Sequence, residues 1–421
     1  MPLNTTTNNL DKTNVSNFIL TKDIPRHRWY YFKEGFSPLL VETAIKENNI
    51  KENDLVIDTF SGSGTVPLVS SISNIKSIGY EINPFMTFVA KTKLSNVKSN
   101  TFDFYNDKIL SGIKIGKESN LENYSTFSKT KENEKWLFNK SVLRGFEGGW
   151  EATKEIPYEV AKLYRLALVS STMMNSNAIK DGKCLRYKNN WDELSYTKNT
   201  LLKDFIENCK IISEDLESTR IQKEATIING DVRKILSENS KFSLCITSPP
   251  YLNSFDYSDI YRPELFLCKY VKSNNSLGKL RLNTLRSHMQ INWELPKKSK
   301  FGILYNECIN ELLKRKDLLW NKKIPVMIQA YFEDIENILI KLKRKAKKDA
   351  QLWIVVSTSA YAGVHIPVDL IITDIGTKLD WELVGIKNMR NMRNSTQNAQ
   401  KYLSGIGDTK RLRESLIIFK N

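Results

Sequence analysis

The stretch Thr-Ser-Pro-Pro-Tyr at residues 247–251 ends the short apolar run Phe242–Ile246. Proline fixes φ and has no backbone N–H, so two adjacent prolines cannot continue a central strand or a helix. The chain must therefore leave its strand in a rigid turn that carries the hydroxyl of Ser248 and the ring of Tyr251. Such a turn is either a plain loop or a site, and the rest of the sequence decides between the two.

A glycine-rich turn, "DTFSGSGT" at residues 58–65, lies between a short apolar run and a helical pattern. Gly62 and Gly64 allow positive φ and a close approach of the backbone to a ligand. The turn lacks the third glycine of a dinucleotide fingerprint and the Gly-Lys-Ser/Thr of a P-loop. Glu81 ends the next predicted strand, where a carboxylate is placed to accept both hydroxyls of a ribose. The alternative is a tight turn with a solvated Glu.

The two turns and the "FSP" element at residues 36–38 together resemble the amino-methylating DNA methyltransferases, which use S-adenosylmethionine. That family's cofactor turn, Asp-Pro-Phe-x-Gly-x-Gly-Thr, is matched at residues 58–65 except that Thr59 replaces the proline. Its catalytic turn, Ser/Asn/Asp-Pro-Pro-Tyr/Phe, is matched at residues 248–251. The resemblance implies a Rossmann-like seven-stranded methyltransferase sheet, and it does not extend to the middle of the chain.

The resemblance also implies a role for each matched position. The catalytic residues would be Ser248, Pro249, Pro250 and Tyr251. The residues that bind S-adenosylmethionine would be Phe36, Ser37, Asp58, Phe60, Gly62, Gly64, Thr65, Glu81 and Asp231. Among these, Glu81 would hold the ribose and Asp231 would accept from the adenine amino group. Asp231 and Ser37 are also predicted helix N-caps, and both roles are compatible.

The chemistry of an exocyclic amine explains the Pro-Pro turn. The lone pair of such an amine is delocalised into the base, so the nitrogen must rehybridise before it accepts a methyl group. The Ser248 hydroxyl and the Pro249 carbonyl can accept its N–H groups, and two prolines keep these acceptors fixed. The Tyr251 ring offers a stacking face for a flipped base.

The sequence leaves several methyl acceptors and activities possible. Carbon-5 methylation of cytosine needs a Pro-Cys nucleophile, and the chain contains no Pro-Cys dipeptide. Members of the resembled family with Ser in the catalytic turn mostly methylate cytosine N4, which we therefore prefer to adenine N6. An RNA methyltransferase and a DNA-binding subunit without turnover are further alternatives. The resemblance also implies the modification enzyme of a restriction–modification pair, with a cognate endonuclease as partner.

The order of elements predicts one α/β sheet with a helical insertion. Strands at 54–58 and 76–83 alternate with helices at 36–48 and 84–94, as in parallel βαβ units. Further strands are predicted at 225–231, 241–250 and 351–360, and 381–389 with 414–420 form a closing antiparallel pair. The predicted parts are a flexible tail at 1–20, a catalytic domain at 21–96 and 223–421, a target-recognition insertion at 97–222 with helices at 157–174 and 191–216, and a basic segment at 271–325.

The formal net charge of +16 favours a polyanionic partner, nucleic acid before a membrane surface. Residues 271–300 hold seven Lys or Arg and one Glu, which predicts either DNA contact or a solvated loop. Residues 180–191, "KDGKCLRYKNNW", are predicted as a loop between helices that reads DNA. The predicted contacts with double-stranded DNA are Lys183, Arg186, Lys188, Lys279, Arg281 and Arg286.

Composition narrows the class of protein. The five cysteines are scattered without a C-x-x-C, which fits a reducing cytoplasm and neither a disulfide framework nor a zinc site. The three histidines match no metal-ligand spacing, so no metal is predicted. The N-terminus lacks an apolar signal segment and no apolar run has the length of a membrane span, so we expect a cytoplasmic protein without a membrane partner.

Overall fold

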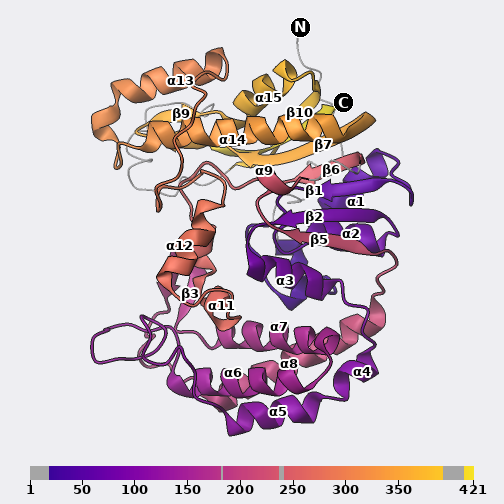
Figure 1. Cartoon of the computed structure of the whole chain (residues 1–421), viewed down its shortest axis with the longest axis vertical. Helices are drawn as coiled ribbons and strands as arrows, with labels where there is room; N and C mark the ends of the chain where they lie inside the picture. Colours follow the sequence, from indigo (N-terminus) through magenta and orange to yellow (C-terminus); the bar gives the residue numbers. More distant parts are fainter. Residues whose placement is uncertain (1–18, 182–183, 237–240, 392–411) are drawn as a thin grey trace.

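A twisted sheet of seven strands forms the centre of the computed structural model (Figure 1). Its strands, in spatial order, are β10 (Glu382–Asn391), β11 (Arg413–Lys420), β7 (Ala346–Ser357), β6 (Phe242–Thr247), β1 (Leu55–Asp58), β2 (Lys76–Glu81) and β5 (Ala225–Asn229). The structure describes residues 19–181, 184–236, 241–391 and 412–421. Residues 1–20, predicted as a tail, lie almost entirely outside these ranges.

Strand direction confirms the predicted fold class. The five strands from β7 to β5 pair in parallel, and β11 runs antiparallel to both β7 and β10. The closing antiparallel pair predicted from the sequence is thus β10 and β11. The sheet is the Rossmann-like methyltransferase arrangement with one reversed strand.

Helices cover both faces of this sheet because its central strands are apolar on both sides. Val56 of β1 packs against α1 (Pro38–Glu47) and α2 (Thr65–Ile72) on one face. The next residue, Ile57, points to the opposite face, towards α9 (Val232–Ile235), α14 (Ile324–Lys345) and α15 (Val368–Lys378).

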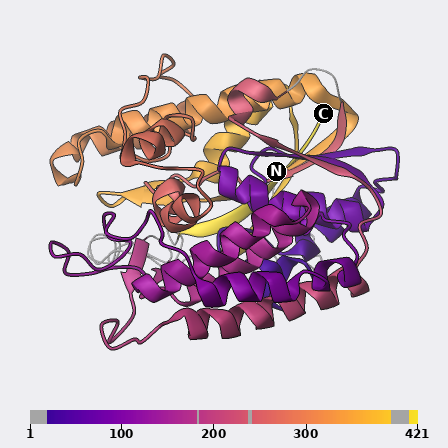
Figure 2. The same ribbon diagram turned by 60° about the horizontal axis from the view of Figure 1, so that its bottom comes forward.

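The segment between β2 and β5 is mostly helical and packs below the sheet (Figures 1 and 2). After α3 (Pro84–Lys93) come α4 (Ser99–Asp103), α5 (Asn106–Ile115), α6 (Lys140–Ala152), the 3-10 helix η4 (Thr153–Glu155), α7 (Tyr158–Met174), the strands β3 (Ala178–Asp181) and β4 (Cys184–Tyr187), and α8 (Lys198–Ser218). Phe85 of α3 and Phe146 of α6 belong to one continuous apolar core. The insertion therefore shares its core with the sheet domain.

The remaining elements follow β6 in the chain and lie at the left of the molecule and above the sheet in the view of Figure 1. They are α10 (Tyr257–Ile260), α11 (Arg262–Leu267), α12 (Asn274–Leu282), α13 (Ile303–Lys314), the 3-10 helix η5 (Lys316–Leu318), and the hairpin of β8 (Ser359–Tyr361) and β9 (Val364–Ile366). Two 3-10 helices, η2 (Ile19–Lys22) and η3 (His27–Trp29), precede α1. No helix in the described ranges is long and apolar enough to cross a membrane.

Two local predictions were wrong. The predicted helix at 191–216 begins at Lys198, because Thr197 forms a capping box there and the Trp191 ring packs edge-on against Trp136. The predicted loop at 180–191 overlaps the strands β3 and β4, which pair with each other antiparallel. The exposed positions of these four-residue strands include Ile179 and Cys184 beside Asp181 and Arg186, so the segment lacks the regular alternation of apolar and polar residues that is typical of a strand.

Candidate active site

Four neighbouring parallel strands end at the rim of one cavity of about 360 Å³. Asp58 ends β1 and Glu81 ends β2, while Asp231 follows β5 and Ser248 follows β6. All four residues line the cavity. The carboxyl edge of an open α/β sheet is where such folds bind their ligands.

Most of the predicted site residues meet at this cavity. Those that line it are Phe36, Asp58, Phe60, Gly62, Thr65, Glu81, Asp231, Ser248, Pro249, Pro250 and Tyr251. Ser37 and Gly64 do not. Ser37 is buried and caps α1, accepting from the Leu39 N–H at 3.3 Å. Gly64, at φ 84°, precedes α2, and a Cβ there would lie 2.7 Å from Ala90 of α3.

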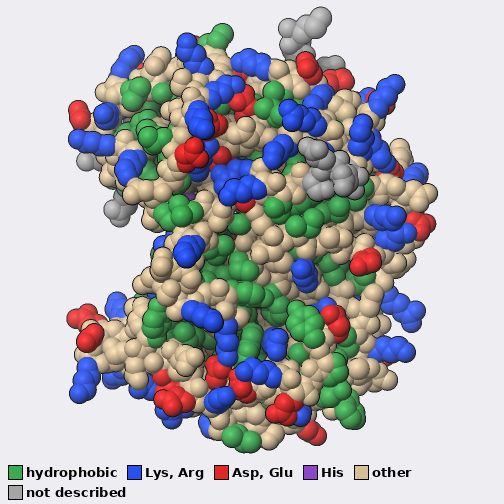
Figure 3. Space-filling view, viewed as in Figure 1, with side chains coloured by type: hydrophobic (Ala, Val, Ile, Leu, Met, Phe, Trp, Pro, Cys, Tyr) green, Lys and Arg blue, Asp and Glu red, His purple; other side chains and the backbone are tan. Residues whose placement is uncertain are grey.

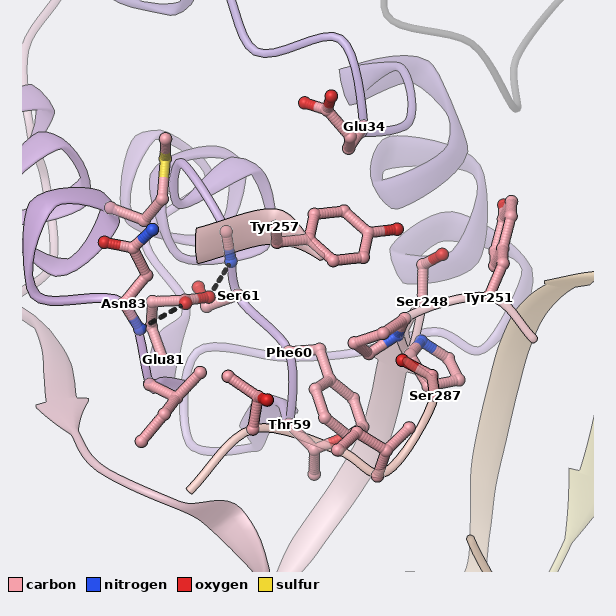
Figure 4. Close-up of a pocket in the computed structure, with 18 of the residues that line it drawn as sticks. Glu34, Thr59, Phe60, Ser61, Glu81, Asn83, Ser248, Tyr251, Tyr257 and Ser287 are labelled. Carbon is pink, nitrogen blue, oxygen red and sulfur yellow. Dashed lines mark hydrogen bonds between the residues drawn. The ribbon is translucent and has the colours of Figure 1, made fainter. Parts of the chain in front are cut away.

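Glu81 is held at the cavity wall by two backbone donors (Figure 4). The Gly62 N–H donates to Oε2 at 2.7 Å and the Asn83 N–H donates to Oε1 at 2.8 Å. A carboxylate can accept about four hydrogen bonds, so each oxygen keeps capacity for a further donor. Gly62 has φ 50°, and a Cβ there would lie 2.7 Å from the Phe32 ring. The turn therefore presents a fixed acceptor beside backbone that a side chain would obstruct.

Two carboxyl groups near the cavity titrate close to neutral pH. Burial raises the pKa of Glu81 to about 7, and hydrogen bonds from backbone N–H groups, including those of Gly62 and Asn83, oppose the rise. Burial also raises the pKa of Asp58 to about 7, the Phe60 N–H and the Thr247 hydroxyl oppose the rise, and the Glu81 charge adds to it. The site thus changes charge within the physiological range.

Asp231 is already committed to neighbouring donors. It caps α9 by accepting from the Arg233 N–H at 3.0 Å, as predicted. The Arg233 guanidinium also donates to both of its oxygens, each at 2.9 Å. These contacts fix the carboxylate at the cavity, and its bond to an adenine amino group stays a prediction.

Hydrogen bonds join the glycine turn to the Pro-Pro turn. The Thr247 hydroxyl donates to Asp58 Oδ1 at 2.9 Å. The Thr59 hydroxyl lies 2.9 Å from that of Thr247. Thr59 is the position where the sequence departs from the proline of the resembled motif, and here it bridges β1 and β6.

Side chains from distant parts of the sequence anchor the Pro-Pro turn. The Tyr361 hydroxyl donates to the Leu252 carbonyl at 3.0 Å, and the Ser359 hydroxyl donates to the same oxygen. The Tyr251 phenol donates to Glu414 Oε1 at 2.6 Å. The Ser248 hydroxyl lies at the cavity between the rings of Tyr251 and Tyr257 (Figure 4).

Comparisons with known proteins place this site in a family. The family model described as "DNA methylase" matches residues 6–91, which include the "FSP" element, the glycine turn and Glu81. Over these residues the chain matches the amino-methylating DNA methyltransferases, the family that the sequence motifs predicted.

Curated relatives extend the similarity over most of the methyltransferase. The Type II methyltransferase M.BsoBI of Geobacillus stearothermophilus is 26% identical over 89% of this chain and 82% of its own. The Type II methyltransferase M.AvaI of Nostoc sp. is 26% identical over 88% and 82%. M.MjaII of Methanocaldococcus jannaschii, also a Type II methyltransferase, is 23% identical over 79% and 72%.

Solved structures show only a distant similarity. The rRNA methyltransferase aviRa of Streptomyces viridochromogenes has a TM-score of 0.30 and 9% identity over 91% of this chain and 85% of its own. A SAM-dependent methyltransferase of Methanosarcina mazei has a TM-score of 0.31 and 10% identity over 90% and 96%. The fold of the methyltransferase is defined by its own strand order.

The cofactor of this family is S-adenosylmethionine, and the cavity fits it. Glu81 has the acceptor capacity for two ribose hydroxyls, and Gly62 leaves the backbone open beside it. Phe60 and Phe36 supply apolar walls. When bound, the cofactor supplies an activated methyl group on a sulfonium.

Sequence reasoning missed several cavity residues, among them Glu34, Arg390 and Glu414. They come from segments that carry no motif, so only the fold brings them to the site. Glu414 left one signal, because it is a charged residue that lies shortly before the apolar run 416–419 of β11 and is buried with it.

The predicted DNA contacts have different environments in the methyltransferase. Arg186 of β4 is 58% exposed and pairs with Asp181 at 2.8 Å. Lys279 of α12 is exposed. Lys188 donates to the Tyr196 hydroxyl at 2.9 Å and lies over its ring. Lys183 lies outside the described residues.

The other two cations have internal carboxylate partners. Arg281 pairs with the buried Asp256 at 2.6 Å. Arg286 pairs with Glu333 and with the buried Asp334, each at 2.7 Å. DNA contact therefore stays a proposal for the exposed Arg186 and Lys279 first.

Proposed function

We propose that the methyltransferase moves the methyl group of S-adenosylmethionine to the exocyclic N4 of a cytosine flipped out of duplex DNA. One observation carries this proposal: a single cavity holds both the Glu81 turn and the Ser-Pro-Pro-Tyr turn. Serine as the first residue of that turn favours cytosine N4 over adenine N6.

The Ser248 hydroxyl and the Pro249 carbonyl accept the two N–H groups of the amine and draw its nitrogen out of the base plane. The nitrogen lone pair then forms a bond to the methyl carbon. The carbon–sulfur bond breaks, its electron pair stays on sulfur, and the surplus proton of the methylated amine leaves to solvent. Because Pro249 and Pro250 fix the turn, these acceptors need no reorganisation during transfer.

Aromatic side chains support base flipping. The rings of Tyr251, Phe255, Tyr257 and Tyr261 all line the cavity. Flipping costs a few kcal/mol, and stacking a base on one ring returns about 1–3 kcal/mol. The pocket can therefore hold an extrahelical base at little net cost.

The biological role that we propose is protection of a restriction site. The relatives named Type II methyltransferases support this role. The partner would be an endonuclease that cuts the same sequence when it is unmodified.

The test is to incubate purified enzyme and labelled S-adenosylmethionine with duplex DNA and, separately, with RNA, and to separate the digested nucleosides by mass spectrometry. N4-methyldeoxycytidine is the expected product. N6-methyldeoxyadenosine would replace the proposed acceptor, and label in RNA alone would replace the substrate. A fully active cofactor site without any methylated product would overturn the enzymatic assignment.

A further inference from the structure

A serine hydroxyl can donate one hydrogen bond and accept others, and only the accepting mode helps an amine nucleophile. If the Ser248 proton pointed at the amine, it would compete for the lone pair that must attack the methyl group. The site therefore needs a separate acceptor for that proton.

The Tyr251 phenol is placed to be this acceptor. It already donates its own proton to Glu414 Oε1 at 2.6 Å, so its oxygen has only lone pairs left to offer. Desolvation raises the pKa of Tyr251 well above its usual value, the Glu414 charge adds to this, and a hydrogen bond from the Ser248 hydroxyl opposes it. The phenol donates to Glu414, and Figure 4 shows the Ser248 hydroxyl beside Tyr251 at the cavity that both residues line.

Glu414 is fixed from its other side. Arg390 and Glu414 are directly opposite residues of β10 and β11. Arg390 Nε lies 2.8 Å from Glu414 Oε2 and its Nη2 lies 3.2 Å from Oε1. The Glu414 side chain is 1% exposed, and its two oxygens accept from Arg390 and from the Tyr251 phenol.

We propose that Glu414 is a positioning residue that sets the direction of the Ser248 hydroxyl through Tyr251. Glu414 takes the phenol proton, Tyr251 takes the serine proton, and the Ser248 oxygen is left as an acceptor for the target amine. This inference rests on the proposed methyl transfer to an amine. It gives the last residue of the Ser-Pro-Pro-Tyr turn a second task besides stacking.

The test measures the single-turnover rate of methyl transfer for the wild type, Tyr251→Phe, Glu414→Gln and the double variant. Tyr251→Phe removes one oxygen and keeps the ring. We expect roughly a tenfold to hundredfold loss of rate in each single variant, below the full effect of removing one preorganised hydrogen-bonding group. The double variant should be no slower than Tyr251→Phe, because both changes break the same chain.

Two further readouts separate orientation from binding. The Kd of S-adenosylmethionine and the fluorescence of 2-aminopurine at the target position should match the wild type in Tyr251→Phe. Asp369→Asn is the matched control. Asp369 is also fully buried and bonds to residues of β11, Arg413 at 2.8 Å and Ser415 at 2.6 Å, but it does not line the cavity. Its rate should stay at the wild-type value despite reduced stability.

A wild-type rate in Tyr251→Phe would overturn the inference. This outcome decides the test even if Glu414→Gln does not fold. An equal loss from Glu414→Gln in the wild-type and Tyr251→Phe backgrounds would also overturn it. If the wild type itself methylates no amine, the proposed function fails instead.

Discussion

At the scale of single residues, the protonation of Glu81 is expected to control cofactor binding. Its pKa is raised to about 7, so the carboxylate that accepts ribose hydroxyls is lost as the pH falls through 7. The Kd of S-adenosylmethionine should then rise by up to about tenfold per pH unit below 7. Titration calorimetry between pH 5.5 and 8.5 measures this.

Two variants assign the effect. Glu81→Gln should bind weakly and independently of pH, while Asp58→Asn should keep the pH dependence, although the Asp58 pKa is also about 7. The opposite pattern would move the titrating group to Asp58. The same raised pKa values also affect the stability of the protein without cofactor, because ionising a buried carboxyl group costs free energy. Their contribution to the free energy of unfolding should fall as the pH rises from about 4.5 to 7 and stay constant above pH 7.

Ser248 is expected to act on the rate and not on binding. Ser248→Ala removes an acceptor that matters when the amine rehybridises, so kcat should fall by about 10²–10³. The Kd values for cofactor and DNA should change less than threefold, roughly 0.6 kcal/mol. Single-turnover kinetics with separate binding titrations check this, and near wild-type turnover would remove Ser248 from the mechanism.

At the scale of elements, an ion-pair cluster fastens the segment after α12 to α14. Asp334 of α14 is buried and receives the guanidinium groups of both Arg233 and Arg286. Arg286→Ala leaves part of this buried charge unpaired, and breaking such a pair typically costs about 3–5 kcal/mol. Chemical denaturation should show this loss, whereas Lys314→Ala, at an exposed pair of α13, should cost less than about 1 kcal/mol. If Arg286→Ala left the free energy of unfolding unchanged, the Arg286 side chain would be available for contact with DNA.

Elements with a strong local pattern were predictable and elements defined by distant contacts were not. The parallel strands are short apolar runs bounded by turns, and Ser37 with Pro38 marks the start of α1. The β3–β4 hairpin carries no such pattern. The same holds within the site: Ser248, Tyr251, Gly62 and Glu81 lie in recognisable turns. Glu414 reaches Tyr251 across 163 residues of sequence, and no local rule encodes that contact.

At the scale of the molecule, a hollow separates the part formed by α13 and α14 from the helical insertion (Figure 3). Figure 1 places α12 at this hollow, and Leu280 of α12 lines the active-site cavity. The β4 strand packs beside α10, whose Tyr257 and Ser258 also line the cavity. With a net charge of +16, the enzyme has the electrostatics to hold DNA across this opening.

Lys279 on α12 is expected to contact a phosphate. Lys279→Ala should weaken binding to all DNA sequences alike and reduce the slope of log K against log salt by about 0.9. Fluorescence anisotropy at several salt concentrations measures the slope. Lys108→Ala on α5, at the bottom of Figure 1, is the control and should leave it unchanged.

Arg186 on the β3–β4 hairpin is expected to read a base. Its ion pair with Asp181 is exposed on both sides, 58% and 53%, so breaking it for a base edge costs at most about 1 kcal/mol. A good bidentate contact to a base is worth about 1–3 kcal/mol of discrimination. Arg186→Ala should therefore relax the methylated sequence at one position by roughly tenfold, with an unchanged melting temperature. Sequencing-based mapping of methylated sites decides the matter. If every modified site stays the same and only the amount of methylation falls, Arg186 is a backbone contact, and the base-reading surface lies elsewhere along the hollow.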